Sequence, residues 1–112
     1  LTREVPASSE MVELAARVVL ATQPGGDAPA DIKRYVRHGA SPRGGQALLW
    51  TAKARALVRG RLHVALEDIE AALAPALRHR LILGYEGEAA GISTDALARA
   101  AFEHARSRVS WR

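Results

Sequence analysis

The stretch from Ser41 to Gly60 constrains the fold most, because it carries both the start signal and the stop signal of one long helix. Ser41 can accept a hydrogen bond from a backbone N–H of the first turn. Pro42 suits the first helical position, where its missing N–H costs nothing. Gly60 readily adopts the left-handed conformation that ends a helix. We therefore predict a helix over residues 42–59.

Apolar residues cover most of this helix. One set lies near a single face, and a second set widens the apolar surface around it. The first set is Ala47, Leu48, Thr51, Ala52, Arg55 and Val58, and the second is Leu49, Trp50, Ala54, Ala56 and Leu57. We expect little of this helix to be free of neighbours, with Leu48 in the core.

The composition favours one helical domain. The 112 residues are 48% hydrophobic, mostly Ala, Leu and Val, with only five aromatic residues (two Trp, two Tyr and one Phe). Small and unbranched apolar residues favour closely packed helices over a sheet. We predict an all-α fold, a small helical bundle of about four to five helices that spans residues 1–112 as a single domain.

The absence of cysteine excludes disulfides and thiolate metal sites, and it favours an intracellular, cytoplasmic location. The sequence contains no run of about 18 apolar residues, so it predicts no membrane span. Because the sequence begins with Leu1 rather than Met, we expect it to be a fragment of a longer protein.

The first forty residues predict one further helix. Ser8 caps it and it runs to about Thr22, followed by a loop over residues 23–29 that is rich in Pro and Gly. Residues 31–38 fit either an extended segment or a short helix. Within them, Tyr35 is expected to cover the core and His38 to lie on the surface.

The second half predicts a helix that begins near Ala65, a poor N-cap, with acidic residues in its first turns. Pro75 should break or kink it, and a separate helical segment should follow over residues 75–83. Residues 84–91 read as an exposed acidic loop. Ser93 then caps a last helix to about residue 106. Its stripe has one large apolar side chain and should pack lightly; it comprises Leu97, Ala100, Ala101 and His104.

The basic residues suggest a binding function. No Asp or Glu occurs over residues 33–61, which makes a local positive field suited to phosphates or acidic surfaces. Arg43 stands in the first turn of the long helix, where it adds to the positive end of the helix dipole and suits an anion. Arg43 could also be an ordinary solvated arginine. The cations near the end of that helix complement its dipole; they are Lys53, Arg55, Arg59 and Arg61.

A complete active site is not expected. The sequence has no GxxxxGK[ST] loop, GxGxxG turn, HExxH helix or GxSxG elbow, and its four histidines form no pair at metal-binding spacing. The chain is therefore expected to supply a residue to another site or to bind a partner.

Four segments resemble the C-terminal lid domain of MoxR-type AAA+ ATPases, over a region from about Val5 to about Arg99. They are Gly39-Ala40-Ser41-Pro42-Arg43-Gly44, residues 52–57, the helix start at Val64 with Glu67-Asp68-Ile69, and residues 75–81. The resemblance implies that Arg43 is a nucleotide-binding sensor 2 residue. It would contact the terminal phosphate of ATP held by a core domain, whereas Ser41 and Pro42 only start the helix. Relatives usually carry a hydroxyl residue where this chain has Ala65.

The same resemblance implies a function for a longer protein. The P-loop and the acidic Mg²⁺-binding strand of the family would lie upstream of Leu1, so the intact protein would use ATP and Mg²⁺ whereas this chain alone would not be catalytic. Implied partners are the chain's own core domain, neighbouring subunits of a ring, and von Willebrand factor A domain proteins that a chaperone-like machine remodels. In related clades, sensor 2 serves either its own subunit's nucleotide or a neighbour's.

Two other functions stay open at this stage. A pI near 10.3 and a net charge of +4 suit a stand-alone nucleic-acid-binding module, although few aromatic residues are available to stack on bases. A purely structural interaction domain is the other alternative.

Overall fold

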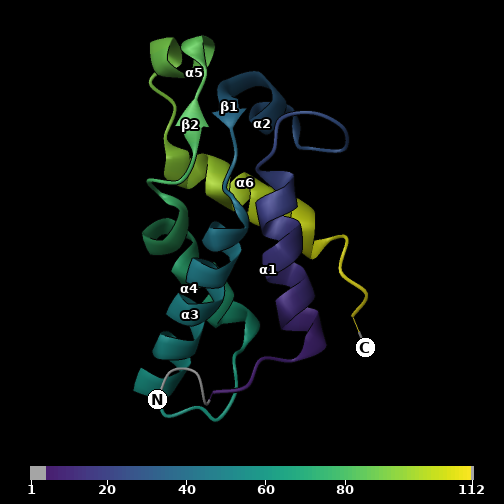
Figure 1. Cartoon of the computed structure of the whole chain (residues 1–112), viewed down its shortest axis with the longest axis vertical. Coiled ribbons are helices and arrows are strands. Elements are labelled where there is room, and N and C mark those ends of the chain that lie inside the picture. The colour runs from purple at the N-terminus through teal and green to yellow at the C-terminus, as the bar shows by residue number, and fades with distance from the viewer. Residues whose placement is uncertain (1–4, 112) are drawn as a thin grey trace.

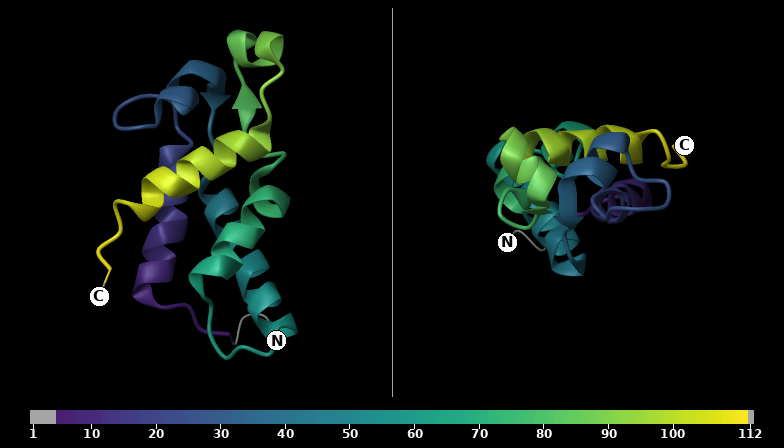
Figure 2. Two further views of the ribbon diagram at one scale, coloured as in Figure 1. Left: turned by 180° about the vertical axis from the view of Figure 1, so that it is seen from behind. Right: turned by 90° about the horizontal axis from the view of Figure 1, so that it is seen from above.

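Two antiparallel helices, α3 (Pro42–Val58) and α4 (Leu66–Leu77), form the centre of the fold in the computed structural model, which describes residues 5–111. Helix α1 (Ser9–Ala21) packs beside α3 (Figure 1). Helix α6 (Thr94–Arg106) crosses both α1 and α4 on the opposite side, as the view from behind shows (Figure 2). These four helices enclose the core.

The remaining elements gather at one end of the 43 × 26 × 19 Å domain (Figure 1). They are α2 (Ala30–Tyr35), β1 (Val36–His38), β2 (Ile82–Leu83) and α5 (Tyr85–Ala90). The two short strands pair antiparallel, with Val36 opposite Leu83. Six helices within residues 5–111 confirm the all-α prediction, and the two six-residue helices account for the excess over four to five.

Serine side chains begin two of the helices as predicted. Ser8 Oγ accepts a hydrogen bond from the N–H of Met11, and Ser93 Oγ accepts from Asp95 and Ala96. The predicted cap at Ser41 is wrong in one respect, because its side chain bonds to no N–H of α3; its backbone carbonyl accepts from Gly44 at 2.8 Å instead. Ser41 is exposed, so water can satisfy its hydroxyl.

Helix α3 ends one residue before the predicted limit. Gly60 has a φ of 73°, and its N–H bonds to the carbonyl of Leu57 while that of Arg61 bonds to Ala56. These two bonds form a Schellman motif, which satisfies carbonyls that the end of a helix leaves open. Gly60 therefore ends the helix as the sequence predicted.

The exposed side of α3 corrects a second prediction. Gly44, Leu48, Ala52 and Ala56 are buried against α1 and α4, whereas Trp50, Leu57 and Val58 are 53%, 43% and 86% exposed. Most residues of the helix are buried or half-buried, so the expectation that neighbours cover it is wrong only in part, at exposed positions such as Leu57 and Val58.

Pro75 does not end α4, which continues to Leu77. Proline cannot bond to the carbonyl four residues earlier, here that of Ala71, but Pro75 and Ala71 both lie on the exposed side of the helix. Water can reach that carbonyl. The predicted helical segment over residues 75–83 is wrong, because the chain leaves α4 after Leu77 and enters β2.

Residues 84–91 contain helix α5 (Tyr85–Ala90) rather than the predicted loop. Gly91 ends α5 with a φ of 67°. Gly87 is buried against Tyr35, where a Cβ would lie 2.8 Å from the carbonyl oxygen of Tyr35. The open question over residues 31–38 is answered by α2 followed by β1, with Tyr35 half-buried against the core and His38 exposed.

Helix α6 packs firmly, so the expectation of light packing is wrong. Phe102 is fully buried, and Leu97, Ala98, Ala101 and Ala105 are buried with it. The buried stripe is rotated from the predicted one and includes the aromatic ring that the prediction omitted. None of the helices within residues 5–111 is long and apolar enough to cross a membrane.

Candidate functional site

Arg43 lies in the first turn of the 17-residue helix α3, and its side chain is exposed. Within residues 5–111 it forms no hydrogen bond or ion pair. The first turn contains no acidic residue, so the positive helix end and the guanidinium charge add together. The structure therefore leaves this cation available to an external anion.

Two glycines after Arg43 bring neighbouring helices close to the first turn of α3. A Cβ on Gly44 would lie 2.9 Å from the Cβ of Ala40 and 3.4 Å from Leu77 Cδ2, and one on Gly45 would lie 3.2 Å from Val19 Cγ2. Glycine disfavours a helix by about 1 kcal/mol relative to alanine. Here the close packing of α4 and α1 offsets that penalty.

Arg80 is a second cation that the fold brings to this end of α3. Its Cδ lies 3.5 Å from the position that a Gly44 Cβ would occupy, and its Nε donates to the carbonyl of Ala76 at 3.1 Å. No sequence motif links Arg80 with Arg43. The packing of α4 on α3 brings Arg80 to this end of the helix.

An apolar groove between α1 and α3 begins beside Arg43. It is open on one side, has a volume of about 460 Å³, and is lined mainly by apolar side chains, among them Val12, Leu20, Pro42 and Leu49. A surface of this kind can pack against another protein segment or an apolar ligand.

The segment before Arg43 is fixed to the end of α1. Thr22 Oγ1 accepts a hydrogen bond from the N–H of Ala40 at 3.0 Å, and Gln23 Nε2 donates to the carbonyl of Ala40 at 2.5 Å. The sequence analysis missed both residues. No periodic pattern links them to position 40, so no sequence signal could have found them.

Two of the cations near the end of α3 serve a structural purpose beyond the dipole. Asp68 is fully buried, and its carboxylate accepts from Arg55 Nη1 at 3.0 Å, from Arg61 Nη1 at 2.9 Å and from the N–H of Ala65 at 2.8 Å. The last bond compensates for the poor cap at Ala65. The predicted positive field is thus partly neutralised by an acid from outside residues 33–61.

Other surface ion pairs connect elements that are distant in sequence. Arg78 Nη2 lies 2.8 Å from Asp95 Oδ2, and Arg34 Nε lies 2.6 Å from Glu86 Oε2. The hydrogen bond from Arg78 lowers the pKa of Asp95, and the bond to Asp95 raises the pKa of Arg78. Glu86 raises the pKa of Arg34 in the same way.

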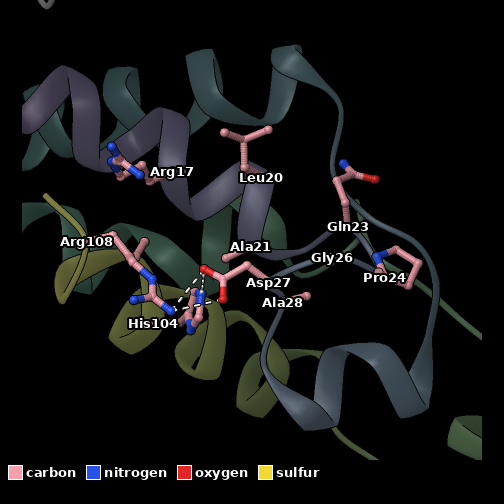
Figure 3. A pocket seen from close by; sticks show the side chains of 12 residues that line it. Arg17, Leu20, Ala21, Gln23, Pro24, Gly26, Asp27, Ala28, His104 and Arg108 are labelled. Carbon is pink, nitrogen blue, oxygen red and sulfur yellow. Dashed lines mark hydrogen bonds and ion pairs between the residues drawn. The ribbon is translucent and has the colours of Figure 1, made fainter.

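A pocket of about 410 Å³ lies between the loop over residues 23–29 and α6 (Figure 3). Asp27 binds Arg108 Nη2 at 2.9 Å and His104 Nε2 at 3.4 Å across it. These ion pairs hold the loop against α6. Across residues 5–111, no three His, Asp or Glu side chains gather in a way that could hold a metal ion.

Comparison with known families defines the class of protein. The AAA lid domain model matches residues 28–101, and the chain belongs to that family. A candidate ATPase of Cytophaga hutchinsonii has the same fold, with a TM-score of 0.81 and 32% identity over 92% of this chain.

Two named relatives specify the type. The chaperone MoxR1 of Mycobacterium tuberculosis is 40% identical over 86 residues, which cover 76% of this chain. Protein MoxR of Paracoccus denitrificans is 46% identical over 54 residues, or 48% of this chain. The chain is thus the lid domain of a MoxR-type AAA+ ATPase, which confirms the resemblance identified from the sequence.

The chain corresponds to only part of each relative. It spans 23% of MoxR1, 16% of the Paracoccus protein and 32% of the Cytophaga chain.

Proposed function

We propose that this lid contributes Arg43 as the sensor 2 arginine of an ATPase site whose remaining parts belong to a AAA+ core domain. The observation that carries the proposal is an exposed arginine, unpaired within the described residues, at the positive end of α3 in a AAA lid. ATP and Mg²⁺ would be held by the core. The lid would act on the nucleotide only when it is joined to that core.

The chemistry of arginine suits this function. Its guanidinium is always charged and presents a planar fork of donors that matches phosphoryl oxygens. Negative charge redistributes over those oxygens during hydrolysis, and a fixed cation stabilises it. A contact that exists with ATP and is lost after hydrolysis would also change the preferred orientation of the lid relative to the core.

This nucleotide-dependent orientation is the proposed source of mechanical work. The intact protein would act as a cytoplasmic, ring-forming chaperone that remodels partner proteins, with von Willebrand factor A domain proteins as candidate clients. The name of one relative, the chaperone MoxR1, supports this class of activity.

Replacement of Arg43 in the intact protein tests the proposal. We expect Arg43→Ala to fold normally and to lower ATP turnover at least about tenfold, against about 10³-fold for arginine fingers, with a smaller effect on ATP binding. Arg59→Ala is the matched control, because Arg59 is exposed just beyond the other end of α3. Equal turnover by Arg43→Ala and the parent protein would refute a nucleotide function for this residue.

The nucleic-acid alternative has less support. Nucleic-acid binding needs free cations, and several arginines form ion pairs with carboxylates of the same chain. They are Arg34, Arg55, Arg61, Arg78, Arg99 and Arg108. Binding to duplex DNA that falls steeply with salt in a log–log plot would favour it nevertheless.

A further inference from the structure

We propose that Thr22 and Gln23, at the C-terminal end of α1, are positioning residues that fix the placement of Arg43. This inference rests on the proposed function of Arg43. Neither residue is expected to touch the nucleotide. They act on Ala40, three positions before the arginine.

Thr22 is fully buried and uses its hydroxyl in both directions. Oγ1 donates to the carbonyl of Val19 at 2.6 Å and accepts from the N–H of Ala40 at 3.0 Å. The first bond fixes the hydroxyl on the last turn of α1, and the second fixes the backbone that leads into α3. A single hydroxyl oxygen can make both bonds because it donates one hydrogen and accepts another.

Gln23 completes the attachment from the other side of the same residue. Its Nε2 donates to the carbonyl of Ala40 at 2.5 Å, so both backbone polar groups of Ala40 bond to the end of α1. Ala40 is itself fully buried. Figure 3 shows the Gln23 side chain turned away from the Asp27 ion pairs, so it takes no part in that cluster.

Gly39 allows the two segments to approach this closely. A Cβ at position 39 would lie 2.6 Å from the backbone carbon of Thr22 and 2.7 Å from its Oγ1, and real Cβ atoms do not approach so near. The sequence Gly39-Ala40 is thus matched to Thr22 by shape as well as by hydrogen bonds.

The short chain between Ala40 and Arg43 transmits this constraint. Pro42 has a fixed φ, and the carbonyl of Ser41 is bonded to the N–H of Gly44 at 2.8 Å. Few backbone torsions remain free between the attachment and the arginine. A displacement of the end of α1 would therefore displace Arg43, and catalysis is sensitive to shifts of about 1 Å.

The test uses the intact ATPase. Thr22→Val keeps the shape of the side chain but removes both hydrogen bonds, and Thr22→Ser is the control that keeps them. Gln23→Ala removes the third bond at an exposed position, so it tests the inference even if Thr22→Val fails to fold. Each variant is also made in the Arg43→Ala background, and kcat, KM for ATP and Tm are measured for all.

We expect Thr22→Val and Gln23→Ala to lower kcat at least about threefold with little change in KM, and Thr22→Ser to match the parent. In the Arg43→Ala background the same substitutions should lower kcat no further, because the residue they position is gone. A purely structural contribution would lower Tm and would reduce kcat equally in both backgrounds.

Three results separate the possible failures. If Arg43→Ala lowers turnover but Thr22→Val and Gln23→Ala do not, the positioning inference is wrong and the sensor function stands. If the decreases caused by these substitutions persist in the Arg43→Ala background, the two residues do not act through Arg43. If Arg43→Ala itself has no effect, the proposed function fails and this inference fails with it.

Discussion

Substitution of Asp68 should destabilise the domain more than that of any neighbouring acid. Its carboxylate is fully buried, whereas the side chains of its partners Arg55 and Arg61 are 28% and 24% exposed. Asp68→Asn removes the negative charge at nearly constant volume. Two guanidinium groups then face one another without an anion between them, and the N–H of Ala65 loses a charged acceptor.

The magnitude follows from burial. Removing one partner of a buried ion pair costs about 3–5 kcal/mol, and the partial exposure of both arginines places Asp68→Asn near the lower limit, at about 3 kcal/mol. For a domain of this size, a loss of about 3 kcal/mol lowers Tm by roughly 10–20 °C. Domains of this kind have a free energy of unfolding of only about 5–15 kcal/mol.

Urea and thermal unfolding of Asp68→Asn measure this loss. Glu67→Gln is the matched control, because Glu67 also pairs with Arg61 but is 64% exposed. Its removal should change stability by no more than about 1 kcal/mol. If the two variants unfold within about 1 kcal/mol of one another, burial does not make Asp68 important and the reasoning is refuted.

Two further predictions concern the core and the surface ion pairs. Leu48→Asp should unfold the domain, because it buries a charge at a site with no exposed surface. Val58→Asp, on the exposed side of the same helix, should still fold. A normal thermal unfolding curve of Leu48→Asp by circular dichroism would contradict the assigned core. The Arg78–Asp95 pair should stabilise the domain at pH values above the ordinary Asp pKa of about 3.9. This stabilisation should be lost as the pH falls through the lower pKa that Asp95 has in the folded state. The Tm difference between the parent and Asp95→Asn should therefore be small at pH 7 and vanish in acid; a difference that grows in acid would show the opposite linkage.

Local signals predicted much of the fold. Ser8, Ser93, Pro42 and Gly60 act within one turn of themselves, so their effects are readable from sequence, and they define α1, α6 and α3. Phe102 was missed because the orientation of α6 depends on α1 and α4.

The candidate site divides in the same way. Arg43 could be proposed from the sequence because its motif is contiguous, and the structure leaves its side chain exposed. Asp68 resembled an ordinary first-turn acid, and its burial follows only from the packing of α3 on α4. The attachment of Ala40 by Thr22 and Gln23 joins residues 18 and 17 positions apart through single hydrogen bonds. Such contacts leave no trace in periodicity or composition.

The crossing of α6 over α1 and α4 has a consequence for biosynthesis. The α3–α4 pair is local, so it can form as soon as both helices have left the ribosome. The contact between α1 and α6 forms later, because most of the described chain is synthesised between these two helices. Until Phe102 emerges, the parts of α1 and α4 that α6 covers remain open to water and to other nascent chains. Translation pauses before α6 would therefore prolong the period in which this lid is vulnerable to aggregation.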